Sequence, residues 1–424
     1  MTATSAPPFR AYLAIVAGWF FGFGLQTTLF PGVVYFTLAE TPERLGLAQM
    51  ALTLPMLLLL PAAGVLAERR DRRILLILFY GLASLFAAIL AGLLMFGLLT
   101  YSALLVYALA VGTCGAFVMP ARDSVINPIV RLSNRMGTPV SLQKAVIITS
   151  LVQFGAQIAG MAAGYVAQLI GPGPLFAVQA GGFALGLMAA ILMPRMLSRR
   201  ADKPHALQDL VDGIGAVIQS NVLGPMTAIM VAVGFFVVGG GFFVIIPVLV
   251  KDVYHASYGA LSSLLVVFWL GAFIANAALA RFGHIDRPGR VIVAAQLVTV
   301  VSLALLSFDM PFAGLYLLDL FWGLGAGVAI SLSRAVVQEH AAKDKLARVL
   351  SVYQLGLFGG MPLGAVLMGY VVAHVGPRDA AWIPVIGLSV VLVAISLLTP
   401  ILRIERRDPG QAIEARRNSQ GDET

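Results

Sequence analysis

The chain has 424 residues, of which 59% are hydrophobic and only 11% are charged. A soluble globular protein is excluded, because soluble domains carry about 25% charged residues and cannot hide so much apolar surface. The formal net charge of +8 does not indicate nucleic-acid binding, because the basic residues lie in gaps between long apolar runs. Cys114 is the only cysteine, so intramolecular disulfides and cysteine-based metal sites are excluded, and we expect no cofactor.

Apolar runs follow one another along the whole chain. Each has about the 20 residues that a helix needs to cross ~30 Å of hydrocarbon. The twelve runs lie near residues 13–36, 46–67, 74–98, 101–121, 146–170, 174–194, 222–249, 259–280, 291–308, 312–333, 349–373 and 382–402. We therefore predict an all-α membrane protein with twelve transmembrane helices.

The basic residues give this protein an orientation. All but three of the 28 Lys and Arg fall in the alternate set of gaps that also holds both termini, and the exceptions are Arg44, Lys251 and Arg378. Because Lys and Arg accumulate in cytoplasmic loops, both termini are predicted to be cytoplasmic. The charge would face anionic headgroups, so the expected partners include membrane lipids but no nucleic acid.

The first span carries an aromatic stripe with one amide. Trp19, Phe23, Gln26 and Phe30 recur at helical spacing. A glutamine amide in hydrocarbon needs a hydrogen-bonding partner, which is either a neighbouring helix or a ligand. The stripe suits an amphipathic or aromatic solute, so we place Trp19, Phe23 and Gln26 on the substrate pathway. The alternative is that these residues only pack against neighbouring helices.

The fifth span presents two amides and two glycines on one face. Gln153, Gln157, Gly160 and Gly164 follow helical spacing. Glycines let neighbouring helices approach closely, so Gly160 and Gly164 are predicted to be packing positions. Gln153 and Gln157 are added to the expected substrate or proton pathway.

The longest polar interruption, residues 195–221, separates residues 1–194 from residues 222–403, with six spans on each side. Within it the apolar residues keep a helical period, at Leu207, Leu210, Val211, Ile214 and Ile218. This pattern predicts an amphipathic helix that either lies on the cytoplasmic membrane surface or packs on the bundle ends. Residues 404–424 are polar and predicted to be a disordered cytoplasmic tail.

The second half carries an acidic residue inside an apolar run. Asp319 lies in the tenth span, where a charge costs at least ~2.5 kcal/mol on insertion scales. We predict a proton-coupling or substrate-contacting carboxylate, with Trp322 on the same helix face. The alternative is a carboxylate near the end of the span that reaches water or caps a helix.

Residues 239–241 are three glycines, which predict a flexing point or, alternatively, a close neighbour. The acidic residues Glu40, Glu43 and Asp252 are expected to be solvated loop charges.

The two halves show weak similarity at a shift of about 204–217 residues. The fifth span contains Phe154 with Gly160, and the eleventh contains Phe358 with Gly364. The fourth and tenth spans end in an arginine, Arg122 and Arg334 respectively. Two six-helix halves related by a repeat are typical of secondary transporters.

The gap after the second span carries a recognisable motif. Residues 64–73 read Gly-Val-Leu-Ala-Glu-Arg-Arg-Asp-Arg-Arg. They resemble the loop 2–3 signature of the major facilitator superfamily, Gly-x-Leu-Ala-Asp-Arg-x-Gly-Arg-Arg. Glu68 replaces the usual Asp and keeps the charge. Asp71 replaces a Gly and so lacks its easy left-handed backbone.

Softer matches at 54–64, 119–122, 212–213, 338–339 and 347–349 are similar to the enterobactin-exporter-like branch of that superfamily. The resemblance implies two six-helix bundles that move by alternating access about a central cavity lined by spans 1, 4, 7 and 10. It implies proton-coupled efflux of a small amphipathic compound from a bacterial inner membrane, by a monomer. The fourth span lacks the mid-span arginine often found in proton-driven members.

The resemblance also assigns a role to the charged residues at the cytoplasmic ends of the spans. They would form a latch between the halves that holds the outward-open state, the alternative being anchoring to the membrane by positive charge alone. The residues concerned are Gly64, Glu68, Arg69, Arg72, Arg73, Arg122 and Arg334.

Other functions remain open at this point. A lysophospholipid or lipid flippase, a nutrient importer and a non-transporting membrane sensor or scaffold would share the same pattern of spans. The sequence has no Gly-x-x-x-x-Gly-Lys-Ser/Thr phosphate loop, no Gly-x-Ser-x-Gly and no His-Glu-x-x-His, so it predicts neither ATP drive within the chain nor an enzyme.

Overall fold

The computed structural model describes residues 7–136, 141–195, 206–282, 285–342 and 345–404, and all the regular secondary structure in these ranges is helical. The first half contains α1 (Pro7–Gly32), η2 (Val33–Thr37), α2 (Pro42–Arg69), α3 (Arg72–Met95), α4 (Tyr101–Asp123), α5 (Ile126–Arg135), α6 (Leu142–Gly164), α7 (Ala167–Ile170) and α8 (Pro172–Leu192).

The helix α9 (Ala206–Ile218) lies between the halves. The second half contains α10 (Leu223–Ala232), η3 (Val233–Ile245), α11 (Ile246–Val248), η4 (Leu249–Val253), α12 (Tyr258–Phe282), α13 (Pro288–Leu305), α14 (Phe312–His340), α15 (Leu346–Val375), α16 (Pro377–Ala380), α17 (Trp382–Leu398) and η5 (Pro400–Arg403). The segments η2, η3 and η4 are π-helical, a wider helix that is rare and often found at functional sites.

The prediction of membrane-spanning helices is confirmed. Twelve segments of the described chain are long and apolar enough to cross a bilayer. The largest difference concerns the fourth span, which was expected to end at Ala121 but continues through α5 to Arg135. The apolar run stops at Arg122 and Asp123, but charge alone does not end a helix, and α5 follows α4 after a two-residue turn.

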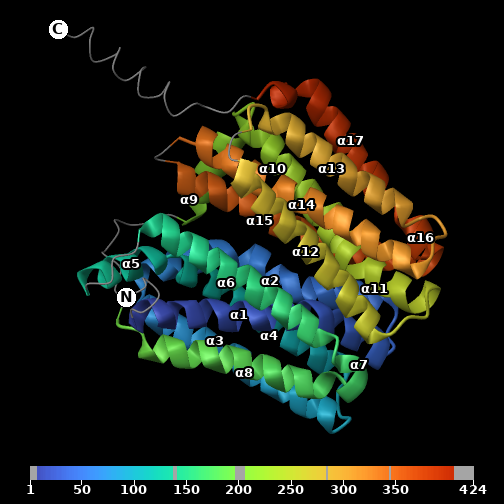
Figure 1. The fold of residues 1–424 in the computed structure, drawn as a ribbon, viewed down its shortest axis with the longest axis horizontal. Coiled ribbons are helices and arrows are strands. Elements are labelled where there is room, and N and C mark those ends of the chain that lie inside the picture. The colour runs from blue at the N-terminus through green and yellow to red at the C-terminus, as the bar shows by residue number, and fades with distance from the viewer. Residues whose placement is uncertain (1–6, 137–140, 196–205, 283–284, 343–344, 405–424) are drawn as a thin grey trace.

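The helices form two bundles, one from α1–α8 and one from α10–α17 (Figure 1). The helix axes run roughly parallel, so the molecule has two ends. One end, here called the basic end, holds the start of α1, α5 and α9 and, because successive spans alternate in direction, the connection between α2 and α3, and it lies on the left of Figure 1. The other, the opposite end, holds α7, α11 and α16. Between the bundles, α2 packs along α15 and α6 packs along α12.

The internal repeat is visible in the packing. A Cβ on Gly160 would lie 2.2 Å from the carbonyl oxygen of Phe21, and one on Gly364 would lie 1.9 Å from that of Phe235. Each glycine therefore lets the fifth span of its half cross the first span at backbone distance. The seventh span behaves similarly, because a Cβ on Gly239 would lie 2.3 Å from a carbonyl oxygen of α15, so the glycine run 239–241 admits a close neighbour here.

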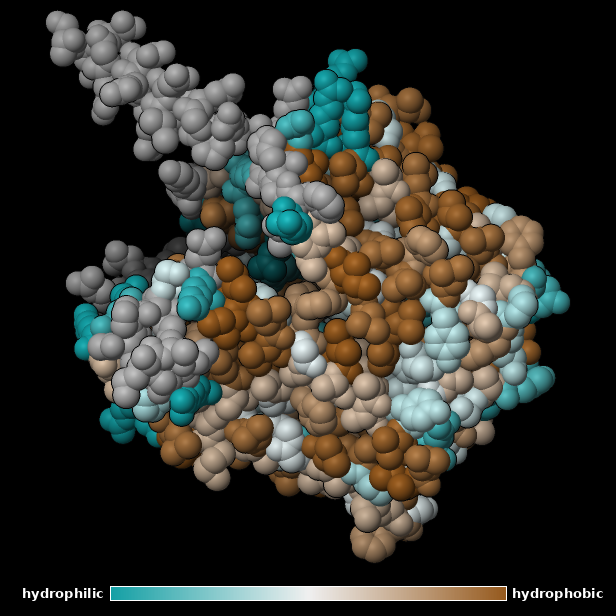
Figure 2. All heavy atoms as spheres, in the orientation of Figure 1, coloured by the Kyte–Doolittle hydropathy of each residue, from teal (hydrophilic) through white to brown (hydrophobic). Residues whose placement is uncertain are grey.

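Several hydrogen bonds join the two bundles at the opposite end. The Tyr258 hydroxyl donates to the carbonyl oxygen of Leu29 over 2.5 Å, and the Ser262 hydroxyl donates to that of Met161 over 2.6 Å. Tyr35 is bonded in the same region to residues of η4. At the basic end Figure 2 shows a recess between the bundles, with hydrophilic side chains inside it. The structure is thus closed at the opposite end and parted at the basic end.

The helix α9 packs on the bundle end by an unexpected face. A Cβ on Gly213 would lie 3.0 Å from the carbonyl oxygen of Arg348, and Val217 is buried. Arg348 also pairs with Asp212, with 3.1 Å between Nη1 and Oδ2. The predicted apolar stripe instead points outward at Val211 and Ile218, which are exposed. The structure shows packing on the bundle end by one face, and placement of the free apolar face on the membrane surface stays a prediction. Of the predicted tail, 404–424, Ile404 is buried, and residues 405–424 lie outside the described residues.

Candidate functional site

A cavity of about 100 Å³ lies between the bundles. It is lined by aromatic, aliphatic, methionine, amide and hydroxyl side chains, and none of its lining residues is charged. The lining residues are Trp19, Phe23, Gln26, Thr27, Pro31, Gln49, Leu52, Thr53, Met56, Val111, Gly112, Gly115, Met119, Phe243, Phe358 and Met361. Typical pockets for drug-sized ligands measure about 300–1,000 Å³, so this cavity must widen to admit one.

The predicted stripe of the first span lies in this cavity. Trp19, Phe23 and Gln26 all line it. The indole of Trp19 is held by two rings of the same bundle, with ring centroids 5.5 Å from Tyr80 and 5.2 Å from Phe183. A ring fixed in this way offers a rigid apolar wall to a ligand and loses little conformational entropy on binding.

The amide of Gln26 has a partner in a neighbouring helix. Gln179 of α8 is fully buried, and its Nε2 donates to the Oε1 of Gln26 over 3.2 Å and to the carbonyl oxygen of Gly22 over 3.0 Å. The Tyr107 hydroxyl of α4 donates to the Oε1 of Gln179 over 2.9 Å. Three spans thus hold one hydrogen-bonded chain that ends at the cavity.

Several lining residues were not singled out from the sequence. Gln49 of α2 is buried, and its Oε1 has no hydrogen-bond partner among the described residues. Phe243 and Phe358 bring the second bundle to the cavity. A glutamine within an apolar run was the available signal for Gln49, as it was for Gln26, whereas a phenylalanine in a membrane helix carries no signal of its own.

The tenth span stands apart from the cavity. Asp319 is 2% exposed, and its Oδ1 has no hydrogen-bond partner among the described residues. Trp322, one turn on, packs edge-on against Phe242 and Phe268 within the second bundle. Neither Asp319 nor Trp322 is among the residues that line the cavity. The carboxylate is therefore enclosed by its own bundle in this conformation.

The two glutamines of the fifth span are also outside the cavity lining. Gln157 is buried against α1, where a Cβ on Gly24 would lie 2.1 Å from the Gln157 carbonyl oxygen. Gln153 is half-buried. The glycines of this face permit close packing as predicted, because a Cβ on Gly164 would meet the Thr28 hydroxyl at 2.2 Å.

The loop motif caps a helix rather than turning left-handed. Asp71 has φ −62° and ψ 115°, and its Oδ1 accepts a hydrogen bond of 3.0 Å from the Arg73 backbone N–H. The departure from the usual Gly is thus explained, since Asp is a strong N-cap residue. The Arg73 guanidinium donates to the carbonyl oxygen of Ile191 within the same bundle. Arg69 is exposed and Arg72 is half-buried, Gly64 has open space about it, and the side chain of Glu68 lies outside the described residues.

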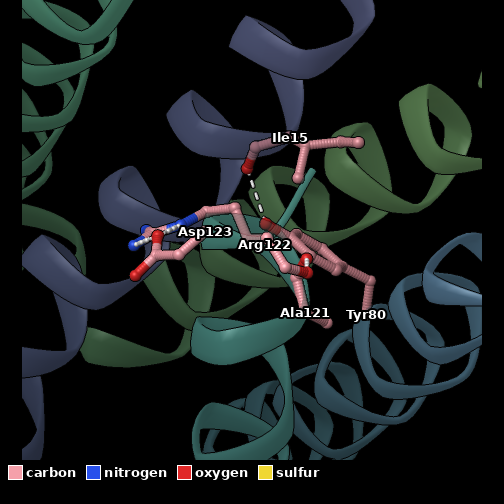
Figure 3. Close-up of polar contacts among 6 residues, drawn as sticks. Ile15, Tyr80, Ala121, Arg122 and Asp123 are labelled. Atoms are coloured by element: carbon pink, nitrogen blue, oxygen red, sulfur yellow. Dashed lines mark hydrogen bonds and ion pairs between the residues drawn. The ribbon is translucent and has the colours of Figure 1, made fainter. Parts of the chain in front are cut away.

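Arg122 is buried in the first bundle, 6% exposed. Its Nε and Nη2 donate to the Asp123 carboxylate over 2.9 and 2.6 Å, and its guanidinium lies 4.7 Å from the ring centroid of Phe20. Figure 3 shows it beside Tyr80, whose hydroxyl donates to the Ile15 carbonyl oxygen. Its repeat counterpart Arg334 is exposed. The two arginines therefore have different surroundings in this conformation.

Comparison with known proteins identifies the family of this chain. A family model described as transmembrane secretion effector, from the major facilitator superfamily, matches residues 32–416. The chain belongs to this family. It is 25% identical over 353 residues to the enterobactin exporter EntS of Shigella flexneri, covering 83% of this chain and 82% of that protein. The same exporter from Escherichia coli O139:H28 is also 25% identical, over 354 residues.

Solved structures agree in fold. The nucleoside transporter NupG superposes with a TM-score of 0.72 at 13% identity, covering 92% of this chain and 98% of that one. A bacterial homologue of the human lysosomal transporter Spinster, in an inward-facing unoccupied conformation, has a TM-score of 0.67 at 14% identity and covers 96% and 100%. This chain is a multi-pass transmembrane transporter with the major facilitator fold, and it is not an enzyme.

Proposed function

We propose that this protein exports a small, uncharged, amphipathic or aromatic compound by alternating access. The cavity between the bundles carries this proposal, because its walls combine aromatic rings with amide and hydroxyl groups and contain no charged side chain. Such walls favour a ligand with a large apolar surface and a few polar atoms. The direction follows from the relatives, both of which are exporters by name.

The proposed orientation places the basic end in the cytoplasm. Positive charge at that end supports it, because Lys and Arg accumulate on the cytoplasmic side of the inner membrane. The parted conformation would then be the one that loads substrate from the cytoplasm. Cysteines at Arg69 and Lys203, in a Cys114→Ala background, should both resist a membrane-impermeant thiol reagent in intact cells and react after the membrane is permeabilised. Labelling of both in intact cells would reverse the orientation, and labelling of only one would contradict the even number of spans between them.

Proton coupling is assigned to Asp319. Burial of an ionised carboxylate without a cationic partner costs at least ~2.5 kcal/mol, and Asp319 forms no ion pair with any described residue. A rearrangement that gives this carboxylate access to water would therefore be linked to gain or loss of its proton. The latch is assigned to the loop motif, whose described arginines lie at the parted end and would meet the second bundle when that end closes.

The deciding experiment uses purified protein in liposomes under an imposed pH difference. The panel contains a neutral aromatic amide, a cationic dye, a catechol, a nucleoside and a fluorescent lysophospholipid. Movement of the neutral aromatic compound against its gradient, driven by protons, supports the proposal. Movement of the lysophospholipid alone indicates a flippase, and movement of none indicates a scaffold or sensor. If cells that express the protein accumulate the transported compound instead of losing it, the protein is an importer.

A further inference from the structure

The side of the Gln26 amide that faces the cavity is fixed by a backbone atom. The carbonyl oxygen of Gly22 can only accept a hydrogen bond, so the Gln179 atom 3.0 Å from it must be the amide nitrogen. The same nitrogen lies 3.2 Å from the Gln26 side chain, which must then present its oxygen. Tyr107 occupies the remaining oxygen of Gln179. The chain thus turns the oxygen of Gln26 away from the cavity and leaves its nitrogen free.

The Gln26 nitrogen is a donor that no described residue satisfies. Gln26 is 4% exposed and lines the cavity. Its Nε2 has no hydrogen bond among the described residues, yet it is not one of the sealed polar atoms that lack a partner. It therefore remains accessible from the cavity. Gln49, on the α2 wall, has an Oε1 without a partner among the described residues, but this atom is sealed from the cavity in this conformation. The Nε2 of Gln26 is therefore the amide atom left for a ligand to satisfy.

The rest of the wall limits what that ligand can be. Trp19, Phe23, Phe243 and Phe358 give aromatic surface, and three methionines give an adaptable one. A charged ligand would find no opposite charge in the lining. An oxygen acceptor on an aromatic body would instead meet the free N–H groups of Gln26. The polar atoms and the apolar walls therefore select the same kind of molecule.

We propose that Gln26 is a specificity-determining residue that donates through Nε2 to a carbonyl-type oxygen of a neutral aromatic substrate. Gln179 and Tyr107 act as positioning residues, because they hold the amide of Gln26 in the donating orientation without lining the cavity. This inference rests on the proposed function and names the chemical class of its substrate.

The test compares benzophenone with diphenylmethane. The two molecules have the same rings and differ only in a carbonyl in place of a methylene. On irradiation, benzophenone attaches to neighbouring C–H bonds, so peptide mapping shows where it binds. Each unlabelled compound is then added in increasing amounts, and the decrease in this attachment gives the affinity of that compound. With the full chain in lipid nanodiscs, we expect labels on the peptides that contain Met56, Met119 or Met361. We expect benzophenone to bind about ten-fold more tightly than diphenylmethane, the gain of one hydrogen bond.

Three variants assign that preference. Gln26→Leu should abolish it, with the affinity for diphenylmethane kept. Gln179→Leu should reduce it although Gln179 does not line the cavity, because the Gln26 amide is no longer oriented. The matched control is Gln296→Leu, a buried glutamine of α13 outside the cavity lining, which should leave the ratio of affinities unchanged. That ratio, unlike either affinity alone, does not respond to a general loss of stability.

Two results would overturn the inference. One is a wild-type protein that binds both compounds equally or carries its labels away from the cavity, and this result needs no variant to fold. The other is a preference that survives in Gln26→Leu. Failure of transport in liposomes, with the carbonyl preference intact, would refute the proposed function and leave the recognition standing. Transport in liposomes without a preference for the carbonyl compound would refute the recognition by Gln26 and leave the proposed function standing.

Discussion

The hydroxyl of Tyr35, at the end of the first span, donates a hydrogen bond to the carboxylate of Asp252 in the other bundle. Lys251 donates to the Tyr35 carbonyl oxygen over 2.5 Å, and its Nζ lies 4.5 Å from the centre of the Tyr35 ring. Two charged residues of the second bundle therefore bind one tyrosine of the first. The expectation of a solvated loop charge is corrected here, because Asp252, although exposed, lies in the helix η4 at the end of the seventh span and ties the bundles together at the opposite end.

This tie predicts that Tyr35→Phe weakens closure of the opposite end. A hydrogen bond to a charged group contributes about 1.5–3 kcal/mol, so its loss should shift the equilibrium between conformations by roughly ten-fold or more. Spin labels at Leu98 and Asp379, both exposed at that end, should report a larger population of long distances in the variant.

Tyr101→Phe is the matched control for this measurement. The Tyr101 hydroxyl also lies at the opposite end and donates to the Arg44 carbonyl oxygen over 2.7 Å, but both residues belong to the first bundle. Its loss should leave the distance distribution as in the wild type. Equal broadening in both variants would mean that the Tyr35 contact does not hold the bundles together.

The crossing of α2 and α15 gives a second prediction. A Cβ on Gly46 would lie 2.4 Å from the Ala365 carbonyl oxygen and 3.2 Å from the Cα of Gly369. Gly46→Ala should therefore push the bundles apart at the opposite end, at a cost of about 1–3 kcal/mol to the closed form. Reduced transport together with wider distances between the same spin labels is the expected outcome.

Gly92→Ala provides the comparison, because a Cβ on Gly92, in α3, meets nothing within 4 Å. Because glycine loses more backbone freedom on folding than alanine does, that variant should be slightly more stable. If Gly46→Ala behaved like Gly92→Ala in both transport and distances, the close crossing would not be a requirement for closure.

Much of this architecture is readable from the sequence because the bilayer imposes strong rules. Length and apolarity locate the spans. Glycines at 160 and 364 indicate two equivalent helix crossings, one in each half. Gln26 was identifiable because an amide inside hydrocarbon must have a partner. In each case a single residue type carries a large physical cost or advantage at its position.

The remaining features depend on contacts between residues far apart in the chain. Gln26 is oriented by Gln179, more than 150 residues away, and no local pattern pairs the two. Asp252 reads as a loop charge until Tyr35 is placed beside it. Asp319 satisfies every sequence criterion for a cavity carboxylate, yet the rotation of α14 places it within its own bundle. Helical periodicity gives a face but not the neighbour that it meets.

The two repeat-related arginines should differ in their effect on stability. Arg122 makes a forked contact with Asp123 and stacks on Phe20, and a lysine can reproduce neither geometry. Because Asp123 is largely exposed, the ion pair is partly screened, so we expect Arg122→Lys to cost about 1–2 kcal/mol. Arg334→Lys, at an exposed position, should cost close to nothing. Thermal unfolding in detergent measures both, and equal midpoints would remove the structural role of Arg122.

Asp319→Asn should separate proton coupling from substrate movement. The amide has nearly the size of the carboxyl group but cannot exchange a proton, so the packing of Asp319 within the second bundle is kept. In liposomes, exchange of substrate at equal pH on both sides should persist, while uphill transport driven by a pH difference should fall at least ten-fold. Asp309→Asn is the control, since Asp309 is an exposed carboxylate that pairs with Arg378, and its variant should retain pH-driven transport. If Asp319→Asn transports uphill with an unchanged pH profile, the coupling proton must be carried elsewhere in the chain.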